Sequence, residues 1–155
     1  NEINSLEPTA DILVKTSDLK GIRLNTALVA NMIDEMPAFF IAAALAEGIT
    51  KIKDVKELRA KESDRLQAMS EALESFGVKF HLNGDGIVIN GLGKDGVFKA
   101  SKISSHGDHR IAMASSIASL RAEGETTIID CHNVNTSFPN FIDVCREVGI
   151  NIAET

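Results

Sequence analysis

Tryptophan and tyrosine are absent from this sequence of 155 residues, and seven phenylalanines supply all of its aromatic side chains. Its hydrophobic core must therefore be mainly aliphatic. Cysteine is almost as scarce: Cys131 and Cys145 are too few for a disulfide scaffold, which predicts a reducing, cytoplasmic environment. The longest apolar run, residues 39–46, has about half the length that a membrane-spanning helix requires, so we expect no membrane partner.

Basic residues are also in the minority. The chain has 16 lysines and arginines against 22 acidic residues, a formal net charge of −6. This charge repels a nucleic-acid backbone, so we expect no nucleic acid, although a small anionic ligand needs only a local positive site. A content of 44% hydrophobic and 25% charged residues is typical of a globular protein, and the length suits one domain. Because the first residue is Asn1, we expect an excised segment of a longer protein.

Four helices are predicted from apolar residues at helical spacing, and each ends at a glycine. Their approximate ranges are 37–47, 66–76, 110–123 and 137–148. We expect the last helix to begin at Ser137 and to bury Phe138, Cys145 and Val148. Runs rich in β-branched residues predict strands at 12–15, 21–25, 50–55, 78–82, 87–90 and 126–130. The Asn-Gly-Asp-Gly sequence at 83–86 predicts a tight hairpin turn, so the fold class is α/β with antiparallel hairpins.

A nine-residue pattern occurs twice. Residues 46–54, AEGITKIKD, recur at 122–130 as AEGETTIID, a shift of 76 positions with six identities. The same shift sets Asp34 opposite Arg110, and the run 61–65 opposite 137–141, each near a helix start. Free backbone N–H groups and the helix dipole favour bound anions there. We therefore expect Asp34, Glu62 and Arg110 to share one surface and one site.

The run Lys61-Glu62-Ser63-Asp64-Arg65 precedes one of the predicted helices. If this turn is helical, Lys61 and Arg65 share a face and offer two cations to a phosphate or carboxylate, with Glu62 between them as a proton carrier. The alternative is a solvated helix start, in which Ser63 or Asp64 is the cap. Composition alone favours that alternative.

The run Asp108-His109-Arg110 directly precedes an apolar helix. Arg110 can bind an anion there and His109 can orient a carboxylate. The alternative makes Asp108 an N-cap and Arg110 a surface cation. Asp34, just before another apolar helix, is either a cap or a base that faces a substrate hydroxyl.

Metal and cofactor sites are not predicted. The histidines and acids of residues 106–109, and the pair Cys131-His132, lack the spacing of a ligand set. Glycine-rich phosphate loops of the P-loop or dinucleotide type do not occur. We therefore expect neither a metal ion nor a cofactor.

Four motifs carry a resemblance that covers nearly the whole chain: IDEMP at 33–37, ELRAKESDR at 57–65, GDHRIAM at 107–113 and SFP at 137–139. Together they resemble the C-terminal part of the 5-enolpyruvylshikimate-3-phosphate (EPSP) synthase family. That family has two domains, each built from three βαβαββ units with helices packed inside mixed sheets, the inside-out α/β barrel of enolpyruvyl transferases. The resemblance implies that residues 1–155 are a C-terminal domain portion with two repeat units, the first incomplete, and that the N-terminal domain of the same chain is missing.

The resemblance also implies a reaction of the shikimate pathway, in aromatic amino-acid biosynthesis. The enolpyruvyl group of phosphoenolpyruvate passes to the 5-hydroxyl of shikimate 3-phosphate, and phosphate is released. Asp34 matches the group that takes the hydroxyl proton, Glu62 the group that exchanges a proton with the methylene carbon, and Lys61 a shikimate-site lysine. The residues that match the phosphoenolpyruvate site are Arg65, His109 and Arg110.

One departure concerns Thr136, which stands where many members of the family carry a lysine. A cation near phosphoenolpyruvate is then missing or supplied elsewhere. Two other interpretations stay open: the related transferase that acts on UDP-N-acetylglucosamine, and a non-catalytic α/β binding module. For the isolated chain we expect folding without turnover.

Overall fold

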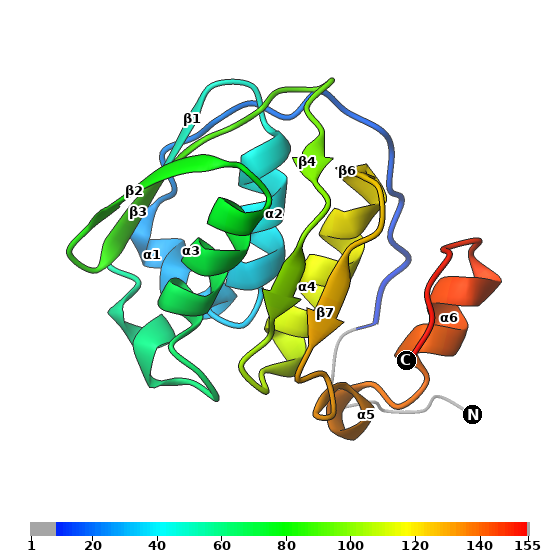
Figure 1. Ribbon diagram of the computed structural model, residues 1–155. Helices are drawn as coiled ribbons and strands as arrows, with labels where there is room; N and C mark the ends of the chain where they lie inside the picture. Colours follow the sequence, from blue (N-terminus) through cyan, green and yellow to red (C-terminus); the bar gives the residue numbers. More distant parts are fainter. Residues whose placement is uncertain (1–8, 155) are drawn as a thin grey trace, which may run out of the picture.

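The computed structural model describes residues 9–154, in which helices and short sheets alternate along the chain (Figure 1). The helices are α1 (Thr26–Val29), η1 (Ala30–Met32), α2 (Met36–Leu45), η2 (Lys56–Ala60), α3 (Arg65–Ser75), α4 (His109–Ala118), η3 (Ser119–Arg121), α5 (Val134–Ser137) and α6 (Phe141–Glu147). The strands are β1 (Ile49–Ile52), β2 (Lys79–Asn83), β3 (Gly86–Asn90), β4 (Phe98–Lys99), β5 (Lys102–Ser104), β6 (Ala122–Glu123) and β7 (Thr127–Ile129).

The first two predicted helices are confirmed as α2 and α3. Pro37 occupies the first turn of α2, where its missing N–H costs nothing, and α2 gives way to extended backbone at Ala46. In α3 the Asp64 carboxylate caps the N-terminus by accepting from the Gln67 backbone N–H at 2.9 Å. Gly77, with φ of +80°, follows its C-terminus. Local sequence signals therefore set both ends of each helix.

The three-stranded sheet has the order β1–β3–β2 and is antiparallel throughout. The predicted hairpin is confirmed: Asn83 pairs with Gly86, so the turn between β2 and β3 has two residues, and Gly84 has φ of +58°. Helices α2 and α3 pack against one face of this sheet (Figure 1). The main core lies between them and includes Phe40, Leu73 and Ile89, each fully buried.

The remaining strands are short. β4 pairs with β6 and β5 pairs with β7, both in parallel, so the sheets are mixed as a set. Residues 12–15, predicted as a strand, are in no strand of the described chain, and Ile12 is 84% exposed. The predicted strand 21–25 is reduced to backbone bonds with β1, such as the one from Lys51 N–H to the Ile22 carbonyl at 2.7 Å. The strand prediction at 12–15 was wrong, and that at 21–25 is reduced to an isolated bridge between Arg23 and Lys51, because β propensity gives a strand only where a neighbour pairs with it.

Two helix predictions were wrong in extent. The third helix ends at Ala118, not at 123, because residues 122–123 form β6 beside β4. The fourth is split into α5 and α6 around Pro139. The residue before a proline avoids the helical region, and Phe138 accordingly has φ of −140° and ψ of 78°. Cys145 is buried as predicted, whereas Phe138 and Val148 are exposed.

The backbone repeats at the predicted shift of 76 positions. Gly48 and Gly124 have φ of +90° and +111°, and Asp54 and Asp130 have φ of +58° and +63°. The second helix after each copy begins at the matching residue, Arg65 for α3 and Phe141 for α6. The copies differ in their sheets, because β1 pairs with an antiparallel strand and β7 with a parallel one.

A smaller cluster joins α4 to the last helices. Its buried members are Ala112, Val134, Phe141 and Cys145. Figure 1 shows α6 at the periphery, away from the sheet β1–β3–β2. Among residues 9–154, no helix has the length and apolar character needed to cross a membrane.

Candidate active site

The starts of α2, α3 and α4 meet at one place, and the unusual polar residues gather there. Asp34 lies in the turn before α2, Arg65 is the first residue of α3, and Asp108 is the N-cap of α4. Arg110 joins the two copies of the repeat, because its Nη1 donates to the Asp34 carbonyl oxygen at 2.9 Å. The expectation that Asp34 and Arg110 lie together is therefore confirmed in geometry.

Arg65 is the centre of this cluster, and its side chain is only 1% exposed. Its guanidinium donates to three carboxylates: Nε to Asp108 at 2.8 Å, Nη1 to Asp34 at 2.8 Å and Nη2 to Glu62 at 2.5 Å. Burial disfavours the charged guanidinium, but the bonds to Asp108 and Asp34 outweigh it, so the pKa of Arg65 is raised. A buried cation is tolerated only with such compensation.

Asp34 faces three cations. Besides the bond from Arg65, its carboxylate lies 3.6 Å from Lys61 Nζ and 3.5 Å from Arg110 Nη2. Burial alone raises the pKa of Asp34, but the Arg65 bond and the charges of Arg110 and Lys61 reverse the effect, and the net pKa is lowered. Asp34 is therefore a carboxylate at neutral pH, able to accept hydrogen bonds from hydroxyl groups.

Asp108 has a second role that the sequence did not reveal. Its Oδ1 caps α4 through the Arg110 backbone N–H at 2.9 Å, as the N-cap alternative predicted. Its Oδ2 accepts from Arg65 Nε and from Ser63 Oγ, the latter at 3.1 Å. Burial raises the pKa of Asp108. The hydrogen bonds from Arg65 and from the Arg110 backbone N–H lower it by more, so the net pKa lies below the ordinary value. The cap signal was visible in the sequence, whereas the partner 43 positions away was not.

Comparison with known proteins decides the family. The model of the EPSP synthase family, 3-phosphoshikimate 1-carboxyvinyltransferase, matches residues 2–145. The chain belongs to the EPSP synthase family. A relative in Hydrogenovibrio crunogenus, named 3-phosphoshikimate 1-carboxyvinyltransferase, is 50% identical over 148 residues, which are 94% of this chain and 32% of the relative. A relative of the same name in Methylococcus capsulatus is 48% identical over 146 residues, again 94% of this chain and 32% of the relative.

The fold is also that of an EPSP synthase. The solved EPSP synthase of Acinetobacter baumannii superposes with a TM-score of 0.86 at 43% identity, over 90% of this chain and 33% of that one. The predicted fold class, the α/β architecture of the enolpyruvyl transferases, is thereby confirmed. The chain spans about a third of the length of the curated relatives that it matches.

Several residues singled out by the EPSP synthase motifs sit differently from expectation. Lys61 and Arg65 do not share a helical face, because α3 begins only at Arg65, yet both reach Asp34. His109 begins α4, and among residues 9–154 its side chain makes no hydrogen bond to the cluster. Thr136 lies exposed in α5. The cluster is therefore built from Asp34, Lys61, Glu62, Arg65, Asp108 and Arg110.

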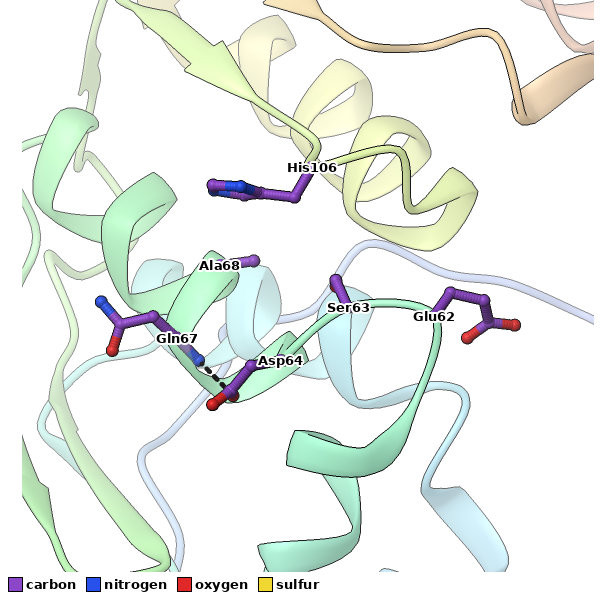
Figure 2. Close-up of a pocket in the computed structure, with 6 residues that line it drawn as sticks. All are labelled: Glu62, Ser63, Asp64, Gln67, Ala68 and His106. Carbon is purple, nitrogen blue, oxygen red and sulfur yellow. Dashed lines mark hydrogen bonds between the residues drawn. The ribbon is translucent and has the colours of Figure 1, made fainter.

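Two hollows lie beside this cluster. One of about 300 Å³ is lined by Glu62, Ser63, Asp64, Gln67, Ala68 and His106. Figure 2 shows Glu62 pointing away from Asp64, and the His106 ring reaching over α3, where it contacts Glu71 at 2.8 Å. The other, of about 260 Å³, lies between α2 and α4, with Asp34, Glu35 and Arg110 at its polar end. Glu62 and Asp34 thus border different hollows, and Arg65 bridges them.

The charges of the cluster nearly cancel. Lys61, Arg65 and Arg110 face Asp34, Glu62 and Asp108, three cations against three carboxylates, and Glu35, 4.0 Å from Arg110 Nη1, adds a carboxylate at the edge. All three carboxylates accept a hydrogen bond from Arg65. The described chain therefore presents polar groups for orientation, but little net positive charge.

Proposed function

We propose that this chain supplies one half of the active site of a 3-phosphoshikimate 1-carboxyvinyltransferase in the shikimate pathway. This transferase moves the enolpyruvyl group of phosphoenolpyruvate to the 5-hydroxyl of shikimate 3-phosphate and releases phosphate. The observation that carries the proposal is the meeting of three helix starts at Asp34, with three cations within 4 Å of its carboxylate. Hydroxyl-bearing anions fit such a place, because the carboxylate accepts from hydroxyls while cations face the charged groups.

Asp34 is the base for the attacking hydroxyl. The bond from Arg65 and the charges of Arg110 and Lys61 lower the pKa of Asp34, which makes it a weak base. Two anionic substrates would neutralise Lys61 and Arg110, and the basicity of Asp34 would then rise. Substrate binding therefore prepares the proton transfer in the same step that aligns the hydroxyl.

Glu62 and Arg65 act together on phosphoenolpyruvate. The three carboxylates on Arg65 differ in exposure: Asp108 is buried, whereas the Glu62 side chain is 51% exposed. Asp34 is 43% exposed but is also held by Lys61 and Arg110, whereas Glu62 is paired with Arg65 alone among the described residues. Glu62 is thus the one that an incoming carboxylate can displace. The exchange gives Arg65 a substrate anion and frees Glu62 to exchange a proton with the methylene carbon.

Lys61, His109 and Arg110 complete the substrate contacts. Lys61 Nζ, 3.6 Å from Asp34, is placed to bind the shikimate hydroxyls that Asp34 also meets. Arg110 is one-third exposed and lies at the polar end of the hollow between α2 and α4, so its guanidinium has room for an anion. His109 precedes Arg110 at the helix start and would turn toward phosphoenolpyruvate only in the occupied site.

The other half of the site belongs to the N-terminal domain of the same chain. Phosphoenolpyruvate and shikimate 3-phosphate carry several negative charges, and a cluster without net charge does not balance them. Residues 1–155 are then a portion of the C-terminal domain with two repeat units, the first incomplete. We also place the protein in the cytoplasm, with small molecules as its substrates and no nucleic-acid or membrane partner.

The test is a comparison of the full-length protein with the 155-residue chain. Both receive phosphoenolpyruvate with either shikimate 3-phosphate or UDP-N-acetylglucosamine, and phosphate release is followed. We expect turnover only by the full-length protein and only with shikimate 3-phosphate. Asp34→Asn in the full-length protein should lower kcat by about 100-fold or more, whereas Asp143→Asn, a carboxylate change on exposed α6, should leave it unaltered. Turnover by the short chain, or with the nucleotide sugar alone, would refute the proposal.

A further inference from the structure

The segment before α3, residues 61–64, is held by its own side chains. Each of the four consecutive residues contacts a different partner. Lys61, Glu62, Ser63 and Asp64 contact, in that order, Asp34, Arg65, Asp108 and Arg59, at 3.6, 2.5, 3.1 and 2.8 Å. Of these four partners, Arg59 alone lies outside the substrate-facing cluster.

Arg59 joins two separate parts of the fold. Its Nη1 donates to Asp64 Oδ2 at 2.8 Å, on the α3 side. On the other side its Nε lies 3.4 Å from Asp85 Oδ1, and its Nη2 donates to the Gly84 carbonyl oxygen at 3.5 Å, both at the tip of the β2–β3 hairpin. A guanidinium presents donors in several directions of one plane, which a lysine ammonium at the same place does not.

The contact acts on a carboxylate that is already engaged. Asp64 Oδ1 caps α3 through the Gln67 backbone N–H, as the dashed line in Figure 2 shows. Arg59 therefore holds Oδ2 of Asp64, the residue whose Oδ1 caps the N-terminus of α3. Lys61 and Glu62 lie between these two anchored points, Arg59 at one end and Asp64 at the other.

The base of this link is rigid. Leu58, next to Arg59, is 1% exposed and anchors η2 in the core. The hairpin tip is tied to the same segment, because the Val55 backbone N–H donates to the Asp85 carbonyl oxygen at 2.8 Å. Arg59 therefore works from a fixed platform, and losing its side chain would loosen the segment 61–64, not the platform.

We propose that Arg59 is a positioning residue for the transfer reaction, which sets the place of Lys61 and Glu62 by holding Asp64 against the hairpin tip. It acts through Asp64 and touches no substrate. This inference rests on the proposed function of Glu62. According to this inference, the function of Glu62 also requires contacts outside the substrate-facing cluster, those by which Arg59 links η2, the hairpin and α3.

The test uses the full-length protein with Arg59→Gln and Arg59→Lys. Arg121→Gln is the matched control, because the Arg121 guanidinium also donates to backbone carbonyl oxygens of a loop, those of Lys94 and Gly96 at 2.9 and 2.8 Å. Arg59→Gln should lower kcat by about 10-fold or more through the displaced Glu62 carboxylate. Arg59→Lys should recover part of that loss, and Arg121→Gln should show none of it.

Hydrogen exchange separates this inference from the proposed function. In Arg59→Gln the peptide covering residues 61–67 should exchange several-fold faster than in the parent protein, with or without catalysis. An inactive parent protein would refute the proposed function, while faster exchange would still support the link and unchanged exchange would overturn it. In an active protein the inference is overturned if kcat stays within twofold, if the loss appears wholly in KM, or if Arg121→Gln causes an equal loss.

Discussion

Replacing Asp108 by asparagine removes the one fully buried anion that faces Arg65. The amide oxygen can still cap α4. The amide nitrogen, which replaces the second carboxylate oxygen, is a donor and cannot accept the hydrogen bonds from Arg65 Nε and Ser63 Oγ. Removing one partner of a buried ion pair costs about 3–5 kcal/mol. Arg65 keeps Asp34 and Glu62, so we expect the lower end, about 3 kcal/mol.

The assay is urea unfolding of the chain at pH 7, with thermal unfolding in parallel. For a chain of this size the loss corresponds to a fall in Tm of roughly 6–12 °C. The control is Asp143→Asn on α6, whose carboxylate is 73% exposed and lies 3.5 Å from Arg146. An exposed pair of this kind contributes about 0.5 kcal/mol or less.

The pH dependence gives an independent check on Asp108. Its pKa in the folded chain is below the ordinary value of 3.8, so its contribution is fully present above that value and is lost as the pH falls through the folded pKa. The difference in stability between the parent and Asp108→Asn should therefore be constant near neutrality and shrink below about pH 4. The argument fails if Asp108→Asn costs no more than Asp143→Asn, or if the difference persists unchanged at pH 3.

Three further predictions concern other parts of the chain. Glu62→Gln should strengthen phosphate binding about three- to tenfold in an amide-shift titration, because the buried Arg65 guanidinium loses a competing anion worth about 1 kcal/mol; Glu74→Gln, exposed on α3, should change nothing, and equal affinities would contradict the displacement model. Gly91→Ala should destabilise by about 1–3 kcal/mol in urea, because its Cβ would lie 1.9 Å from a backbone carbonyl oxygen at the end of α2, and an unchanged midpoint would rule that out. Burial raises the pKa of both Cys131 and Cys145, so alkylation followed by intact mass should be slow at pH 7 and accelerate above pH 9, with the less buried Cys131 modified first; equal rates would disprove the burial order.

Elements whose ends are set by local chemistry could be predicted from the sequence. Helices α2 and α3 and the β2–β3 hairpin depend on Pro37, on the Asp64 cap and on glycines that take positive φ, all of which are readable one residue at a time. The strands β4, β5 and β6 have two or three residues each, too short for an alternating pattern to register. The helix across Pro139 was overextended because apolar spacing was weighted above the proline.

The sequence predicts which residues form the site better than it predicts which of them contact one another. The repeat correctly brought Asp34 to Arg110, because the two residues hold equivalent positions near helix starts that lie together. It gave no sign that Arg65 would be buried under three carboxylates. That arrangement depends on side chains from three elements, and a single sequence does not specify which of several acids reaches one arginine.

The cancellation of charge in the cluster has a kinetic consequence. Long-range attraction falls to zero for a group of charges that sums to zero, and only short-range contacts remain. The cluster itself then contributes little to steering a phosphorylated ligand from solution toward Asp34 and Arg110. The short chain has a formal net charge of −6, so the rate at which such a ligand arrives should not fall as salt is added. Any steep fall of that rate with salt in the full-length protein should originate in the proposed N-terminal domain.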